Sequence, residues 1–570
     1  MQRGGCRASV PRVAGSRPAQ VNEHVAADMT APAAAPDIDE LAEIARSEGL
    51  ADFTSDHRIG EHNVRAFGLD VHNPVFAIAG TATVLFVVFT LAFPDLAAER
   101  FGEWRLWLTT RLDWFFMASA NLFLLLAVYL VASPVGSIRL GGPDARPRYG
   151  YPSWVAMLFA AGIGIGIMFY GVLEPMNHAL TPPLSMDGVS GDALRDLAMA
   201  STIYHWAFHP WAIYATVGLC LAFFSFNKGL PLVMRSALYP IFGERIWGWP
   251  GHVVDVLAVF ATLFGLATSL GFGAEQAAGG LAYVFGLPNG AGLRVAVITA
   301  ITALALVSVL RGLDGGIKVL SELNMLAAAL LGAFVLLLGP TLEILSGVVE
   351  YSTAYFRYLP ELSNWIGRED EYYMHDWTTF YWAWWIAFSP FVGMFIARIS
   401  SGRTVREFVV AALLAPSAIF VLWMTIFGET AMDQFFLQGW EGVATTVREF
   451  QPELTLFVFL GEFPLAMLTS TLGIVLVLVF FVTSMDSGSL IVDTMTAGGK
   501  IETPVGQRIF WCIFLGLLGV ALMLGGGLTS LQALALASAF PFTLVMLLMV
   551  VSLLRGLHAE RALLSAAGQE

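Results

Sequence analysis

The sequence predicts an all-α membrane protein that crosses the bilayer many times. Three observations carry this prediction: 57% of the 570 residues are hydrophobic, only 13% are charged, and the mean hydropathy is +0.69. Soluble domains are about half apolar and about a quarter charged, so this chain has too few charges to coat a water-facing surface of its size. The net charge of −14 argues against nucleic acid as a partner, because phosphate binding needs clusters of Lys and Arg.

Apolar runs of about 20 residues, the length that spans a bilayer as a helix, recur after residue 73. We expect twelve spans, near residues 73–93, 114–134, 153–175, 204–226, 253–274, 293–311, 317–340, 377–398, 408–428, 463–485, 508–528 and 532–554. Residues 341–367 mix apolar, aromatic and charged positions. There we expect an amphipathic helix that lies along the membrane surface.

The two ends of the chain are polar. Residues 1–72 contain no apolar signal-peptide core, so we expect a cytoplasmic tail that is largely disordered up to about Asp37. With this tail inside, the inner loops carry thirteen Lys and Arg residues and the outer segments carry eight. Positive charge favours the cytoplasmic side, so both termini, including a short tail at 555–570, are expected in the cytoplasm.

The third span contains the glycine-rich stretch Gly162-Ile163-Gly164-Ile165-Gly166. Each glycine costs about 1 kcal/mol in a helix interior relative to alanine. Glycines two positions apart lie about 200° apart around a helix, so they do not form one flat packing face. We therefore favour local unwinding over close packing through small residues. Unwound backbone is tolerated at membrane depth where it is buried in protein or lines a cavity.

Tryptophan is concentrated in the eighth span, which reads WTTFYWAWWIAFSPFVG from Trp377. An aromatic belt at the membrane interface explains Trp377 well. It explains Trp382, Trp384 and Trp385 poorly, because they continue inward toward Pro390, where we expect the helix to break.

The fourth span adds Trp206, Trp211 and Tyr214, which can share one broad helix face. Aromatic clusters away from the interface suit a quaternary ammonium ion, which ring faces attract by cation–π interaction worth up to about 2 kcal/mol per ring. A tertiary sulfonium ion would be held in the same way, and neither requires an ionised partner. Structural packing of the rings is the alternative.

Hydroxyl groups gather where the tenth span ends, at Thr483 and Ser484. Hydroxyl and carbonyl oxygens are hard ligands that suit a small cation. The alternative is that these side chains bond to their own helix. Asp486 follows closely, either as a functional intramembrane acid or as a residue at the cytoplasmic surface.

No catalytic motif emerges from the sequence, and we expect a solute carrier rather than an enzyme. A phosphate-binding Walker lysine motif is absent, which argues against ATP drive within the chain. His205 and His209 flank Trp206 at helical spacing, and we interpret them as helix-lining residues. Neither they nor the widely separated cysteines predict a transition-metal site.

The chain over residues 70–555 resembles the betaine/choline/carnitine transporter family. The resemblance rests on four segments taken together: GIGIG with MFYGVLEP, HWAFHPWAIY, WTTFYWAWWIAFSPFVGMFIARIS and VTSMDSG. It implies twelve helices in a leucine-transporter-like fold with two inverted five-helix repeats, in which the first helix of each repeat is broken and substrate binds near the midplane. The implied divisions are peripheral helices at 73–152, the repeats at 153–340 and 377–554, and a surface helix with linker at 341–376.

The resemblance also implies a substrate site. Trp206, Trp211, Tyr214 and Trp385 would form an aromatic box around a trimethylammonium group. Further residues would line the approach, support the box or face the substrate carboxylate through their backbone: Trp377, Trp382, Trp384, Ile163 and Gly164. Phe388 stands where well-studied betaine carriers have another Trp, which indicates a pocket for a different onium solute.

Sodium is the coupling ion that the resemblance implies, with no other cofactor. The first site would use the carbonyls of Ala160, Ile163 and Phe480 and the hydroxyls of Thr483 and Ser484. The second would use Thr262 and the ring of Phe391. Leu266 stands one turn after Thr262, where a second hydroxyl is expected, and this argues against the second site.

These features together predict a sodium-driven symporter for a betaine-like zwitterion, forming a homotrimer in the lipid bilayer of a bacterial inner membrane. Glycine betaine, choline and dimethylsulfoniopropionate are the candidate solutes. Proton-coupled choline uptake and carnitine-type exchange are alternatives; proton-coupled members typically carry Asp at the position of Gly166. A membrane sensor or channel is the alternative from another class, although the aromatic blocks argue against a continuous polar pore.

Overall fold

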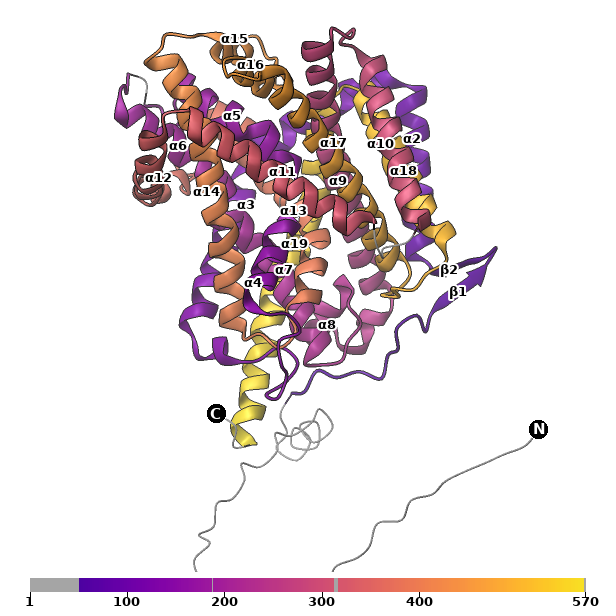
Figure 1. Cartoon of the computed structure of the whole chain (residues 1–570). Coiled ribbons are helices and arrows are strands. Elements are labelled where there is room, and N and C mark those ends of the chain that lie inside the picture. The colour runs from indigo at the N-terminus through magenta and orange to yellow at the C-terminus, as the bar shows by residue number, and fades with distance from the viewer. Residues whose placement is uncertain (1–50, 163, 187, 312–315, 568–570) are drawn as a thin grey trace, which may run out of the picture.

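The computed structural model describes residues 51–567 apart from 163, 187 and 312–315, and it consists of helices with one small hairpin (Figure 1). Within these described residues, eleven helices are long and apolar enough to cross a membrane. They are α2 (Val75–Ala92), α3 (Pro94–Ala132), α6 with α7 (Asp192–Trp206 and Phe208–Phe226), α9 (Trp249–Phe285), α10 (Ala291–Arg311), α11 (Gly316–Leu338), η4 with α13 (Tyr372–Thr379 and Phe380–Ile399), α14 (Val405–Phe436), α17 (Ala466–Thr496), α18 (Val505–Leu524) and α19 (Leu528–Ala566).

Shorter elements connect these spans. The short α-helices are α4 (Tyr151–Gly162), α5 (Ile165–Leu180), α8 (Tyr239–Phe242), α15 (Gly442–Arg448) and α16 (Thr455–Gly461), and the 3-10 turns are η1 (Pro134–Ser137), η2 (Met234–Leu238), η3 (Gly243–Trp247) and η5 (Pro452–Leu454). Helix α12 (Thr341–Leu362) occupies most of the segment expected to form a surface helix. It packs against α6 and α14 and exposes Leu342, Leu345 and Val349.

The third expected span is two helices, α4 and α5, rather than one. Gly164 precedes α5 in an extended conformation, with φ −140° and ψ −154°, so the helix is interrupted inside the glycine-rich stretch, as predicted. Neither helix alone has the length of a membrane span. The count of twelve spans and the two inverted repeats therefore stay predictions.

The fourth span, predicted to be continuous, is interrupted at Ala207. Pro210 has no N–H to donate to the carbonyl of Trp206, four residues earlier. Ala207 departs from helical geometry, with φ −97° and ψ −119°. The interruption lies directly after Trp206, so the two helices α6 and α7 present their aromatic residues from a joint.

The break predicted at Pro390 is wrong, because α13 continues through this residue to Ile399. Proline leaves the carbonyl of Ile386 without its helical donor. The Ser389 hydroxyl lies 2.7 Å from that carbonyl oxygen and donates to it. This side-chain bond satisfies the freed acceptor, so the helix persists.

Local sequence sets other helix ends. Thr404 and Glu407 form a capping box at the start of α14: the Thr404 hydroxyl accepts from the Glu407 N–H, and the Glu407 carboxylate accepts from the Thr404 N–H. This arrangement satisfies two of the four N–H groups that a helix start leaves free. At the far end of α9, Gly286 adopts the left-handed conformation, with φ +69°, that favours glycine.

A buried ion cluster joins distant parts of the chain. Lys228, in the connection after α7, lies 2.6 Å from Glu560 of α19 and 3.3 Å from Asp52. Lys228 and Glu560 are each only 2% exposed. Asn227 adds a hydrogen bond to Glu560, so the N-terminal segment and the last helix meet at one lysine.

The segment before the first span contains a hairpin that the sequence did not predict. Strands β1 (Asn63–Ala66) and β2 (Leu69–His72) pair antiparallel, and Figure 1 shows them at the same end of the bundle as the C-terminal end of α19. Lys500 lies 2.5 Å from Asp70 and holds the pKa of that carboxyl below its usual range. The expected disorder up to Asp37 falls outside the described residues.

Replacing Lys228 tests the ion cluster. Lys228→Met leaves the Glu560 carboxylate buried without its cation, a change that costs about 3–5 kcal/mol for a buried pair. We expect a clearly lower thermal unfolding midpoint for the purified protein in detergent. Lys228→Met with Glu560→Gln should recover part of the loss, since a neutral amide needs no cation. The control Arg100→Met, which removes an exposed pair with Glu103, should leave the midpoint nearly unchanged; an equal shift in both variants contradicts the role of the cluster.

Candidate substrate site

Aromatic rings from α6, α7 and α13 meet at the joint of the fourth span. Trp206 and Trp385 lie 5.4 Å apart edge to face, and Tyr214 and Trp385 lie 5.2 Å apart at 69°. Trp211 follows at 5.5 Å from Tyr214. The four residues are between 1% and 5% exposed, so the rings predicted to form the aromatic box do form one buried cluster, which we call the box.

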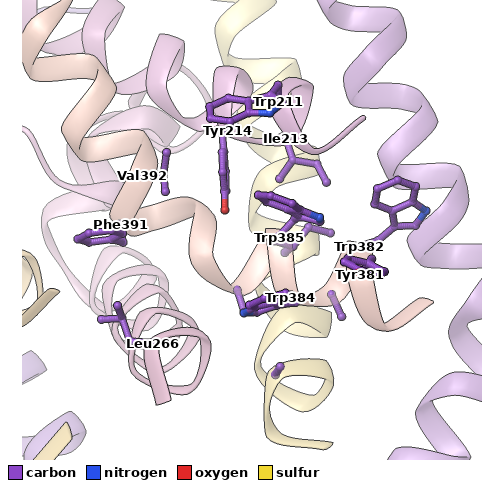
Figure 2. Packing of buried hydrophobic residues seen from close by; sticks show 14 of the residues in the cluster. Trp211, Ile213, Tyr214, Leu266, Tyr381, Trp382, Trp384, Trp385, Phe391 and Val392 are labelled. Atoms are coloured by element: carbon purple, nitrogen blue, oxygen red, sulfur yellow. The ribbon is translucent and has the colours of Figure 1, made fainter. Parts of the chain in front are cut away.

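Figure 2 shows how the box is arranged, with Tyr214 and Trp211 above Trp385 and with Trp384 below it. A backbone contact fixes Trp385: its indole N–H donates to the carbonyl of His205, 3.1 Å away. That carbonyl belongs to the last turn of α6, beside the interruption at Ala207. The helix joint thus holds one ring of the box in place.

A buried carboxylate stands behind the box. Glu174, on α5, is fully buried and accepts four hydrogen bonds. Its Oε2 receives the Trp206 indole N–H at 2.7 Å and the Tyr381 hydroxyl at 2.5 Å. Its Oε1 lies 2.6 Å from Nδ1 of His205 and 3.3 Å from Nε2 of His178. Three helices are therefore tied to one side chain, and Trp206 is one of the tied groups.

Glu174, His178 and His205 are also the kinds of residue that bind transition metals, and their ligand atoms lie within 4.8 Å of one another. The 2.6 Å separation between His205 and Glu174 is that of a charge-assisted hydrogen bond. Two atoms bound to one zinc at about 2.0–2.1 Å each would lie farther apart in tetrahedral geometry. The cluster is arranged as a hydrogen-bonded network.

A cavity of about 230 Å³ lies next to the box. Its walls combine aromatic rings with polar groups: Phe169, Tyr170, Phe272, Trp377, Phe380, Arg105, Asn177, Asp376 and Gln532. Tyr170 lines this cavity and also packs 5.8 Å from Trp206. Tyr170 therefore stands between the cavity and the box, and Trp377 lies on the cavity side.

The remaining predicted substrate residues lie around the box rather than in it. Trp384 packs 6.3 Å from Trp385 and 5.4 Å from Phe272. Trp382 turns to another side, where it stacks on His209 at 5.3 Å. Phe388 packs against Phe391, and no ring contact joins it to the box in the described part of the chain. Gly164 precedes α5, and Ile163 lies outside the described residues.

The residues predicted for the first sodium site are only partly described. Thr483 and Ser484 are half-buried on α17. The Thr483 hydroxyl donates to the carbonyls of Val479 and Phe480, both 3.0 Å away, which is the self-bonding that the sequence left as the alternative. Ala160 lies two residues before the end of α4.

The second predicted sodium site has hydrocarbon at its centre. The Thr262 hydroxyl is buried and donates to the carbonyl of Ala258. Leu266 is 3% exposed, and a Cβ built on Gly488 would lie 2.4 Å from its Cδ1. Leu266 therefore fills the space between α9 and α17, and Figure 2 shows it beside Phe391.

Sequence reasoning missed three residues that contact Trp206. Phe420 of α14 stacks on it at 5.2 Å, Tyr170 packs on it, and Glu174 binds its N–H. A single aromatic residue in an apolar span gives no signal. An acid inside such a span does, because an unpaired charge there is costly and marks a functional site, so Glu174 was open to prediction.

Comparison with known proteins gives consistent matches. The family described as BCCT, betaine/carnitine/choline family transporter, matches residues 74–562. A glycine betaine/proline/choline transporter of Vibrio parahaemolyticus is 52% identical over 532 residues, covering 90% of this chain and 96% of the relative. Glycine betaine transporter 1 of the same organism is 48% identical, covering 89% and 98%. The glycine betaine transporter OpuD of Bacillus subtilis is 40% identical, covering 85% and 94%.

Gly166 allows a close approach to the box that a larger residue would prevent. A Cβ at this position would lie 2.3 Å from Cη2 of Trp206. Gly166→Ala must therefore displace Trp206 and strain its bond to Glu174, at the about 1–3 kcal/mol typical of overpacking. We expect a lower thermal unfolding midpoint in detergent. Gly102→Ala is the control, since nothing lies within 4 Å of its added Cβ; equal midpoints for the two variants contradict the close approach.

Proposed function

Because the chain belongs to the betaine/carnitine/choline transporter family, we propose that it is a secondary active symporter that takes up a betaine-like quaternary ammonium zwitterion with sodium. Its relatives are named transporters rather than enzymes, and the family transports quaternary ammonium solutes. The sodium coupling and the choice of solute are the parts proposed here.

The observation that carries the proposal is the box. A quaternary ammonium ion has no N–H to donate, so it is recognised by the electron-rich faces of rings. Trp206, Tyr214 and Trp385 contact one another in edge-to-face pairs and come from three different helices. Relative movement of these helices would open and close the box around a trimethylammonium group, as alternating access requires.

Sodium is favoured over protons by the residue at position 166. Proton-coupled choline carriers of this family typically have Asp there, and here Gly166 lies so close to Trp206 that a side chain would collide with it. Thr483 supplies a hydroxyl 3.0 Å from the carbonyl oxygen of Phe480. Two such oxygens side by side are suitable first ligands for a small hard cation. Since Leu266 fills the second predicted site, we propose a single sodium.

Glycine betaine is the solute we favour, because the three relatives compared above are named for it. Choline, dimethylsulfoniopropionate and carnitine-type exchange are the other candidates that the same box could serve. Phe388 is half-buried and away from the box, so the Trp that other betaine carriers have at this position is replaced without a new contact to the four rings.

We also propose a homotrimer in a bacterial inner membrane, with both termini cytoplasmic. The relatives are bacterial proteins, and the meeting of the N-terminal segment with α19 at Lys228 supports a common side for the two ends. The exposed apolar side chains of α12 support a contact between copies at this helix.

Uptake into proteoliposomes tests the coupling. Radiolabelled glycine betaine should accumulate with an inward sodium gradient and not with an inward proton gradient alone. Thr483→Ala with Ser484→Ala should raise the sodium concentration for half-maximal uptake several-fold, because two oxygen ligands are lost. Thr299→Ala, which removes an exposed hydroxyl that bonds only within its helix, is the matched control. Accumulation without sodium that a protonophore abolishes overturns sodium coupling.

Substitution of Trp385 tests the box itself. Loss of one desolvated cation–π contact of about 2 kcal/mol weakens binding roughly thirtyfold, and we expect this for Trp385→Leu in a glycine betaine titration followed by intrinsic fluorescence. Trp385→Phe keeps a ring face and should lose less, although the bond to the His205 carbonyl is gone. Trp114→Leu, on an exposed face of α3, should bind normally. Unaltered affinity in Trp385→Leu would remove this ring from the site.

A further inference from the structure

Glu174 carries a negative charge next to the box, as its hydrogen bonds show. Each carboxylate oxygen receives two bonds from N–H or O–H groups. The Trp206 indole N–H can only donate, and an ionised carboxylate can accept at all four contacts. A protonated carboxyl would place its own hydrogen against one of these donors. The four contacts therefore identify the ionised form.

The groups around Glu174 leave this charge uncompensated. The His205 ring uses Nδ1 toward Glu174 and lies with Nε2 3.0 Å from the Thr378 hydroxyl. A neutral ring with its hydrogen on Nδ1 donates to the carboxylate and accepts from the hydroxyl, and a neutral His178 donates through Nε2. Arg368, the nearest guanidinium that acts on His205, is itself paired with Asp370 at 2.5 Å. None of the partners of Glu174 among the described residues is Lys or Arg.

The charge acts on the box through Trp206. Oε2 of Glu174 lies 2.7 Å from the indole nitrogen, and a bound cation sits within about 6 Å of a ring centroid. A hydrogen bond to a carboxylate also raises the electron density of the ring and strengthens its attraction for a cation. Neither effect operates on a neutral solute of the same shape.

We propose that Glu174 is a specificity-determining residue: its buried negative charge, held behind the Trp206 ring, makes the box select a cationic head group over an isosteric neutral one. This inference rests on the proposed function, since it concerns how the box distinguishes its solutes. It also revises the expectation from the sequence that the rings need no ionised partner. For unit charges about 6–9 Å apart at an effective dielectric of about 20, the attraction alters affinity roughly twentyfold to a hundredfold.

A purely structural role for Glu174 predicts something different. If the carboxylate only anchors Trp206 and Tyr381, its loss disorders the rings and weakens every solute of the right shape by a similar factor. If it supplies charge, its loss weakens cationic solutes and spares neutral ones. The ratio of two dissociation constants separates the two roles, and overall affinity does not enter it.

The experiment compares glycine betaine with 3,3-dimethylbutanoate, in which a tert-butyl group replaces trimethylammonium and the carboxylate is kept. Binding of each compound to the full-length protein in detergent is measured by intrinsic fluorescence or by competition with radiolabelled glycine betaine. The unmutated protein should prefer glycine betaine by at least about twentyfold. In Glu174→Gln this preference should fall at least tenfold.

Two further variants serve as controls. Tyr381→Phe removes one donor from Glu174 and leaves its charge, so both affinities should fall alike and the preference should stay within about threefold. Glu174→Asp keeps the charge and shortens the side chain. It should also keep the preference, and it decides the matter if Glu174→Gln does not fold in a thermal unfolding assay.

The outcomes distinguish the inference from the function on which it rests. An unmutated protein that does not bind glycine betaine overturns the proposed function. An unmutated protein that binds both compounds equally, a Glu174→Gln variant that keeps the full preference, or a Glu174→Asp variant that loses it, overturns the charge selection and leaves the transporter assignment in place.

Discussion

One buried carboxylate organises the centre of this protein. Moving an ionised group out of water costs many kcal/mol unless it is hydrogen-bonded, and Glu174 meets this requirement only when α5, α6 and α13 stand in one arrangement. The same bonds orient Trp206 and Tyr381, and the ring of Trp206 then sets the positions of Trp385 and Phe420. A polar requirement therefore fixes the geometry of a site whose surface is almost wholly aromatic.

The long helices were predictable from the sequence, because twenty apolar residues in a row have few alternatives in a membrane. The interruption at Gly164 was also predictable, since glycine weakens a helix by a local property of its backbone. The interruption at Ala207 was not, and the expected break at Pro390 was wrong. Both depend on where a freed carbonyl finds a donor: Trp385 reaches that of His205, and Ser389 reaches that of Ile386.

The site shows the same limit. Trp206, Tyr214 and Trp385 were chosen by residue type and spacing, and their rings do come together. Trp382 has the same type and lies in the same run, yet it faces His209, because side-chain direction changes by about 100° per residue along a helix. Phe420 and Tyr170 enter through tertiary packing alone. The sodium ligands stay predictions, since Ile163 lies outside the described residues.

The meeting of Asp52, Lys228 and Glu560 has a consequence for biosynthesis. A chain is made from its N-terminus, so Lys228 emerges from the ribosome when Asp52 is already present, and Glu560 follows only after almost all remaining helices. Until then the loop after α7 holds an ammonium group with one partner, and burying it is unfavourable. Translation must therefore be nearly complete before this end of the bundle closes, and a nascent chain that stops short of α19 retains a lysine that quality-control proteases can reach.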